Sequence, residues 1–253
     1  MIKETLICTT AGLMLLTITF IIHIIAMAHP RWKIYEHRRE SSKTIFIGTH
    51  QRCESYNRTI TTNLSGTSLI CYDNKYCFQD NHNCANASFS LPCNERQKIC
   101  NYNQNKCACD YSPIGKGLIS CTIISAIALG LSLLLIFLQM LINEFKHKIH
   151  IYVAIITLCL LFLGFIFILI TLILLGSTMS YDLHQYVYNL DLCTRADALT
   201  CCNRTRILKE AAEDYEIRLD WSSVLEIIAL ILSSFTIVTQ AIYLFFTHRN
   251  RIG

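Results

Sequence analysis

The hydrophobic residues of this chain gather into four long blocks that are separated by polar stretches. The blocks lie at residues 5–28, 117–142, 151–176 and 222–247. Each is longer than the roughly 20 residues that a helix needs to cross a hydrocarbon core of about 30 Å. A single segment satisfies all of its backbone groups in lipid only as a helix. We therefore predict an integral membrane protein, mainly α-helical, with a bundle of four transmembrane helices.

The first block has two features of a secretory signal peptide. Lys3 supplies a positive amino-terminal region, and Ala26-Met27-Ala28 has the small-x-small pattern of a cleavage site. Its apolar run is, however, longer than the 7–15 residues typical of a signal peptide. We predict that the block is retained as the first membrane helix, with cleavage after Ala28 as the alternative.

The glycosylation acceptors indicate which connections face outward. The connections 29–116 and 177–221 are long, whereas 143–150 is short. All of the plausible Asn-x-Ser/Thr acceptors lie in the two long loops: Asn57, Asn63, Asn86 and Asn203. Because such acceptors are modified only in the secretory lumen, we predict that both long loops are extracellular. Residues 1–4, 143–150 and 248–253 are then cytoplasmic, and the expected location is the plasma membrane.

Basic residues agree with this orientation with one exception. The cytoplasmic connection holds Lys146 and Lys148, as the preference for positive charge on the inner side requires. Four cations directly after the first helix violate that preference: Arg31, Lys33, Arg38 and Arg39. Long loops cross the membrane largely regardless of their charge, so the glycosylation acceptors decide the orientation.

Eleven of the fourteen cysteines fall in the two predicted outer loops. They are Cys53, Cys71, Cys77, Cys84, Cys93, Cys100, Cys107 and Cys109 in the first loop, and Cys193, Cys201 and Cys202 in the second. In an oxidising compartment they indicate disulfides rather than zinc ligands. Eight cysteines allow 105 pairings, so the spacing alone does not assign them. The odd total leaves one cysteine free, buried or bonded to another chain. For the second loop we prefer one bridge from Cys193 to a member of the adjacent pair.

The first outer loop changes character near residue 73. Residues 29–72 contain strand-like stretches (WKIYE, KTIFIG and TSLICY) rich in β-branched and aromatic residues. Residues 73–110 are rich in Asn and Cys and show little apolar periodicity. Such a segment buries too little apolar surface to hold itself without crosslinks. We predict a small sheet followed by a disulfide-stapled insertion.

The second outer loop has a helical pattern near the membrane. Leu208, Ala212, Tyr215 and Leu219 recur at helical spacing, which predicts an outward extension of the fourth helix. The two loops differ in charge. The first has 12 Lys and Arg against 7 Asp and Glu, a balance of +5, and the second has 5 against 8, a balance of −3. Opposite signs favour packing of the loops together, and two separately solvated faces are the alternative.

The stretch HPRWKIYEHRRESSKTIFIGTHQRC carries a family resemblance. Trp32 follows the first helix closely, Gly48 precedes Cys53 at a fixed spacing, and Cys71 comes later in the loop. This pattern resembles the claudins and the wider group of peripheral myelin protein and the stargazin-like receptor subunits. The resemblance implies a Cys53–Cys71 disulfide that locks two strands of an extracellular sheet, with Trp32 at the boundary between sheet and membrane. Thr49-His50 stands where the family has Leu-Trp, and residues 73–110 are extra to an ordinary claudin loop.

The resemblance implies binding to other membrane proteins, through loops and helices, as the function. Junctional adhesion or a paracellular barrier, with a second copy or a junctional protein as partner, is the first expectation. An auxiliary subunit of an ion channel or receptor, like the stargazin-like relatives, is the alternative. A tetraspanin-like organiser is suggested by the Cys201-Cys202 pair. Tetraspanins, however, have the larger loop between helices three and four, and Gly rather than Asn203 follows their cysteine pair. The terminal Gly253 predicts no PDZ-scaffold motif.

Residue patterns for chemistry are sparse. No HExxH, GxSxG or phosphate-loop pattern occurs, so we predict no enzyme activity, catalytic residue, metal or cofactor. Scattered basic residues predict no nucleic-acid binding. The polar candidates inside the membrane are His23, Glu226 and Gln240. Hydrogen bonds between helices are the simpler interpretation of His23 and Gln240, whereas Glu226 is near enough to Trp221 to lie at the outer interface. Small residues predict close helix contacts at Gly130, Ser132 and Gly164.

Overall fold

The structure is a computed structural model, and the residues it describes fall into two compact units. It describes residues 2–37, 43–58, 66–73, 76–80, 88–92, 109–111, 113–141, 147–179 and 215–252. One unit, the helical unit, comprises Met1–Ala28, Ile119–Ile173 and Ser222–Gly253. The other, the β-rich unit, comprises His29–Leu118 and Leu174–Trp221.

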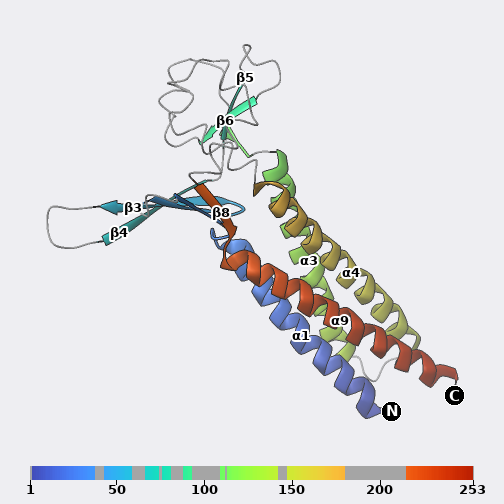
Figure 1. Ribbon diagram of the computed structural model, residues 1–253. Helices are drawn as coiled ribbons and strands as arrows, with labels where there is room; N and C mark the ends of the chain where they lie inside the picture. The colour runs from blue at the N-terminus through green and yellow to red at the C-terminus, as the bar shows by residue number, and fades with distance from the viewer. Residues whose placement is uncertain are drawn as a thin grey trace. The chain divides into compact units, whose positions relative to one another are not determined.

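Four helices are long and apolar enough to cross a membrane, as the four hydrophobic blocks predict. They are α1 (Ile2–Ala28), α3 (Pro113–Leu141), α4 (His147–Ser177) and α9 (Trp221–Ile252), labelled in Figure 1. Several run beyond the predicted blocks, because helical hydrogen bonding does not stop where apolar residues stop. Pro113 suits the first position of α3, since its missing N–H has no partner to lose there.

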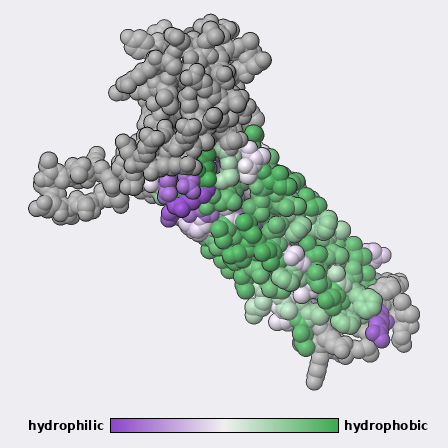
Figure 2. Space-filling view, viewed as in Figure 1, coloured by the Kyte–Doolittle hydropathy of each residue, from purple (hydrophilic) through white to green (hydrophobic). Residues whose placement is uncertain are grey.

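The surface of these helices is apolar. Ile7, Leu141 and Tyr152 are each more than 60% exposed, at 66%, 64% and 68%. Figure 2 shows the hydrophobic colouring running along the described helices. Continuous apolar surface of this extent is unfavourable in water and favourable in lipid. The chain therefore has the character of a multi-pass membrane protein.

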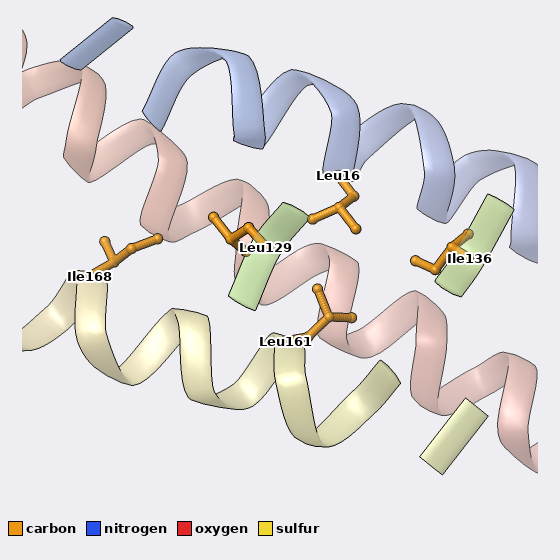
Figure 3. Packing of buried hydrophobic residues seen from close by; sticks show 5 residues of the cluster. All are labelled: Leu16, Leu129, Ile136, Leu161 and Ile168. Carbon is orange, nitrogen blue, oxygen red and sulfur yellow. The ribbon is translucent and has the colours of Figure 1, made fainter. Parts of the chain in front are cut away.

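A small hydrophobic cluster lies between the helices of the helical unit. It consists of Leu16, Leu129, Ile136, Leu161 and Ile168, which project inward from α1, α3 and α4 (Figure 3). Two glycines adjoin neighbouring helices here, and the approach is closer than ordinary van der Waals contact at Gly164 alone of the two. A Cβ atom added at Gly164 would lie 3.1 Å from Cδ2 of Leu129, and one at Gly130 would lie 3.5 Å from Phe20. The predicted helix contacts at Gly130 and Gly164 are thus confirmed, and Ser132 is fully buried.

The β-rich unit contains a five-stranded antiparallel sheet in the order β4-β3-β2-β1-β8. The strands are β1 (Lys33–His37), β2 (Lys43–Ile47), β3 (Gln51–Arg58), β4 (Gly66–Asp73) and β8 (Tyr215–Leu219). The predicted stretches WKIYE, KTIFIG and TSLICY correspond to β1, β2 and β4. The mostly polar β3 (QRCESYNR) carries a weak strand signal of its own, and it forms because β2 and β4 pair with it on both sides.

The predicted outward extension of the fourth helix is wrong over residues 215–219, which form β8. This strand pairs with β1 from Lys33 opposite Leu219 to His37 opposite Tyr215. Tyr215, Ile217 and Leu219 also alternate with charged residues, a two-residue period that suits a strand. The free edge of β1 supplies the hydrogen-bond partners that decide between the two patterns. Leu208 and Ala212 lie outside the described residues.

A second, three-stranded antiparallel sheet lies within the cysteine-rich segment. Its order is β6-β5-β7, with β5 at Tyr76–Asp80, β6 at Ser88–Pro92 and β7 at Cys109–Asp110. The segment's weak apolar periodicity gave no signal for these strands. Cys77 of β5 stands directly opposite Cys109 of β7 in the register.

Candidate functional site

The β1–β8 pairing joins two segments that are far apart in the sequence, and Trp32 stands at one end of the junction. The Trp32 N–H donates to the carbonyl of Ile47 at 3.2 Å, and the Trp32 carbonyl accepts from the Asp220 N–H at 3.0 Å. The Trp32 side chain is only 1% exposed. Trp32, singled out by the family resemblance, therefore lies within the β-rich unit at the point where β8 leads into α9.

Asp220 is the polar centre of this junction. Its Oδ2 atom accepts from Nε of Arg31 at 2.9 Å, and its Oδ1 atom accepts from the N–H of Trp221 at 2.8 Å. A carboxylate at the start of α9 also complements the positive end of the helix dipole. The Arg31 guanidinium lies 4.3 Å from the ring centroid of Phe46, within cation–π range. Arg31 thus links β2 to the residue that follows β8.

The opposite net charges of the loops do not by themselves explain this junction. Arg31 and Asp220 follow the predicted sign difference, with a base in the first loop and an acid in the second. In the other ion pair the signs are reversed, because Arg218 donates to Glu36 at 2.9 and 3.0 Å. That second pair is exposed, so its contribution is small, about 0–1 kcal/mol. Strand pairing and burial hold the segments together.

Two of the four cations that follow the first helix have structural partners. Arg31 is bound as described above, and the ammonium group of Lys33 donates to Oγ1 of Thr178. Lys33 is only 2% exposed. Both positively charged side chains therefore make contacts within the β-rich unit. Arg38 and Arg39 lie outside the described residues.

Gly48 occupies a turn between β2 and β3 that admits no side chain. Its N–H donates to the carbonyl of Gln51 at 2.8 Å. A Cβ atom there would lie 2.5 Å from Cα of Pro30 and 3.0 Å from the Gln51 oxygen. Of the two residues that stand where claudins have Leu-Trp, Thr49 is buried in this turn and His50 is partly exposed.

Cys53 and Cys71, the two cysteines paired by the resemblance, are bonded across β3 and β4. They are direct partners in the strand register, and their Cα atoms lie 4.0 Å apart. Cys53 is fully buried. The bond closes a hairpin with a sequence separation of 18 residues. It therefore crosslinks β3 to β4, which is an edge strand of the five-stranded sheet.

His29 contacts the first residue of α9, Trp221, with its ring tilted against the indole. The ring centroids of His29 and Trp221 lie 4.3 Å apart with the planes tilted by 55°. Burial lowers the pKa of His29 below its ordinary value of 6.5, the positive charge of Arg31 lowers the pKa further, and Asp220 opposes both. The neutral ring is therefore the favoured form in the folded protein.

The helical unit brings two of the predicted intramembrane residues together. Nδ1 of His23 on α1 lies 2.9 and 3.0 Å from the two carboxylate oxygens of Glu226 on α9. Both side chains are fully buried. The hydrogen bond between helices predicted for His23 is therefore present, and its partner is Glu226. The Glu226 carboxylate is enclosed by the helices, and its predicted position at the outer interface, five residues beyond Trp221, stays a prediction.

The second ring nitrogen of His23 contacts α3. Nε2 is 3.2 Å from the Thr122 carbonyl and 2.9 Å from Oγ of Ser125, whose hydroxyl also lies 2.9 Å from that carbonyl. The Thr122 carbonyl only accepts, so its contact with Nε2 is a hydrogen bond when Nε2 carries a proton. On the other side of the ring, Nδ1 lies against both oxygens of the Glu226 carboxylate. Pairing with His23 avoids the cost of an isolated carboxylate buried among the helices.

We call each set of hydrogen-bonded polar side chains among the helices a polar layer: His23 belongs to one, and Gln240 belongs to a second. Its amide nitrogen donates to Oε1 of Gln139 at 3.3 Å, and the Gln139 amide donates to Oγ1 of Thr157 at 3.3 Å. The predicted hydrogen bond between helices is thus present here too. The His23 layer joins α1, α3 and α9, whereas this one joins α3, α4 and α9. Gln139 was not singled out from the sequence. Its signal was an amide side chain within an otherwise apolar stretch of the predicted second helix.

Several predicted sites lie outside the described residues. These are Asn63, Asn86, Asn203, Cys84, Cys93, Cys100, Cys107, Cys193, Cys201 and Cys202. Asn57 lies in β3, and the three cysteines of the helices, Cys8, Cys121 and Cys159, are free thiols. Within the part of the chain that the structure describes, no group of three or more His, Cys, Asp and Glu side chains is arranged to hold a metal ion.

Comparison with known proteins leaves the family of this chain open. Neither a scan against models of protein families nor a search of curated proteins returns a match. Its function is therefore inferred from the five-stranded sheet, the Cys53–Cys71 disulfide and the two buried polar layers.

Proposed function

We propose that this is a claudin-like four-pass protein of the plasma membrane that acts by protein–protein interaction in cell–cell adhesion or in a paracellular barrier. The observation that carries the proposal is the five-stranded sheet. It combines four strands from residues 33–73 with β8, and a disulfide joins β3 to β4. On this proposal residues 29–116 and 177–221 are extracellular, and both termini are cytoplasmic.

The contacts of this sheet favour binding as its function. A surface that is already rigid loses little conformational entropy when a partner associates. Gly48, the Arg31–Asp220 pair and the Cys53–Cys71 bond each limit movement of neighbouring strands. Charged and apolar side chains remain exposed on β8, with Leu219 at 41% exposure beside Glu216 and Arg218. This strand offers both polar and apolar contacts to a partner protein.

The buried polar groups of the helical unit support the same interpretation. The His23–Glu226 pair is enclosed by protein and bonded to α3, and Gln240 is bonded to Gln139. Groups that bond one another in this way hold helices together. The lipid-facing surface is left apolar, which suits a protein that moves laterally and assembles within the membrane.

The proposal is tested by the distribution of a tagged protein in cultured cells that lack it. We expect the protein to concentrate where two expressing cells touch and to be sparse where an expressing cell meets a non-expressing cell. Uniform surface labelling together with one co-purifying channel or receptor would overturn the adhesive role and establish the auxiliary-subunit alternative.

Cysteine variants provide the matched control. Cys53→Ser and Cys71→Ser each break the β3–β4 bond and should block delivery to the cell surface. Cys159→Ser removes a free, exposed thiol of α4 and should leave delivery unchanged. Normal surface delivery of both loop variants would count against a sheet that depends on this bond.

A further inference from the structure

Two cysteines of the cysteine-rich segment lie directly opposite each other on paired strands. Cys77 is the second residue of β5, and Cys109 is the first residue of β7. The antiparallel register pairs Cys77 with Cys109 and Tyr76 with Asp110. Directly opposed residues share one face of an antiparallel sheet, and their Cα atoms lie about 4.5 or 5.5 Å apart. Both separations lie within the range of about 4.4–6.8 Å that is usual for the Cα atoms of a disulfide.

The first sheet shows the same relationship in its bonded form. Cys53 and Cys71 are also direct partners on neighbouring antiparallel strands, and a disulfide joins them. We propose that Cys77 and Cys109 form a second cross-strand disulfide, which anchors β7 to β5. This assignment selects one connection among the many that eight cysteines allow, and it rests on the proposed extracellular position of the loop.

β7 is so short that a crosslink would be needed to hold it in the sheet. The strand has two residues, and it precedes α3, which begins at Pro113. Two rungs of backbone pairing are too few to hold a strand alone. A crosslink that closes a loop of roughly 30 residues restricts the unfolded chain and so favours the paired state. Because Cys109 precedes Pro113 by only four residues, the bond would join β5 to the chain just before α3 begins.

Formation of the bond is a balanced exchange. The Cys77 and Cys109 thiols lose two protons and two electrons in forming one S–S bond. The electrons reduce the disulfide of a thiol–disulfide oxidoreductase of the secretory pathway, through a mixed disulfide between that protein and this chain. With Cys53–Cys71 and Cys77–Cys109 formed, seven of the eleven loop cysteines remain to be assigned.

The sequence allows a direct test by mass spectrometry of the full-length protein. Free thiols are first alkylated, and the unreduced chain is then cleaved before Asp and after Lys and Arg. This cleavage isolates Cys77 in residues 76–79 (YCFQ) and Cys109 in residues 107–109 (CAC). We expect these peptides to be linked. The link should persist in Cys107→Ser and disappear in Cys109→Ser. An alkylated Cys77, or Cys77 bonded to any other cysteine, would overturn the proposal.

The same digest separates failure of this inference from failure of the proposed function. Cys53 falls in residues 53–58 (CESYNR) and Cys71 in residues 59–72 (TITTNLSGTSLICY), with N-glycans removed after digestion. If this pair is linked while Cys77 is not bonded to Cys109, only the second disulfide is wrong. If all four cysteines are alkylated, the loop has not met an oxidising compartment, and both the inference and the proposed topology fall.

Discussion

His23 and Glu226 lie 203 positions apart in the sequence, yet the imidazole Nδ1 and the carboxylate oxygens meet at 2.9 and 3.0 Å inside the helical unit. The contact joins α1, the first helix of the chain, to α9, the last. Through the Thr122 carbonyl and Ser125, it also joins both to α3. A fully buried pair of this kind has large consequences when one partner is removed, because the other is left without compensation.

We predict that Glu226→Ala strongly destabilises the protein and that Glu226→Gln does so less. Loss of one partner of a buried pair costs about 3–5 kcal/mol. Gln keeps an oxygen that accepts from Nδ1, while the Ser125 hydroxyl can turn to donate to Nε2. The thermal unfolding midpoint in detergent, at one heating rate, checks the order. Ser234→Ala removes a hydroxyl that donates within its own helix and serves as the control. A native midpoint for Glu226→Ala would contradict the structural role of the pair.

Gly48→Ala should disrupt the turn between β2 and β3. The new methyl group would lie 2.5 Å from Cα of Pro30, a backbone atom that has no freedom to rotate away. Overpacking of this kind costs about 1–3 kcal/mol or more. Gly176→Ala is the matched control, because a Cβ there meets no atom within 4 Å. We expect reduced surface delivery and a lower thermal unfolding midpoint for Gly48→Ala but not for Gly176→Ala. Equal behaviour of the two variants would argue against the close approach of Gly48 to Pro30.

The two ion pairs of the junction should differ in coupling energy. Arg31 and Asp220 have side chains that are 40% and 16% exposed, whereas those of Arg218 and Glu36 are 57% and 39% exposed. Double-mutant cycles should give about 1 kcal/mol or more for the first pair and less than about 0.5 kcal/mol for the second. Arg31→Gln with Asp220→Asn preserves an acceptor for the Trp221 N–H. Equal coupling energies would show that Phe46 and partial burial add nothing to the Arg31 contact.

Acidification should weaken the contact between His29 and Trp221. Because the pKa of His29 in the folded protein is lower than its ordinary value of 6.5, the unfolded chain binds more protons in this range. The contribution of the neutral ring is therefore present above pH 6.5 and is lost as the pH falls toward the folded pKa. His29→Phe keeps a ring beside Trp221 without a titratable group. Between about pH 7.5 and 5.5, the thermal unfolding midpoint of His29→Phe should fall less than that of the native protein. If the two midpoints fall in parallel, His29 is not the cause of the loss of stability at low pH.

The amino-acid sequence by itself determined the four helices that are long and apolar enough to cross a membrane, and three strands of the sheet, because both signals are local. A helix makes its hydrogen bonds within one segment, so 20 or more apolar residues suffice to identify it in lipid. β1, β2 and β4 are recognisable from β-branched and aromatic residues. Only the tertiary structure decided that residues 51–58 and 215–219 form the strands β3 and β8, because their hydrogen bonds come from neighbouring strands. It also decided that Glu226 faces His23 and Gln240 faces Gln139, because the helix faces that meet are set by packing among remote segments.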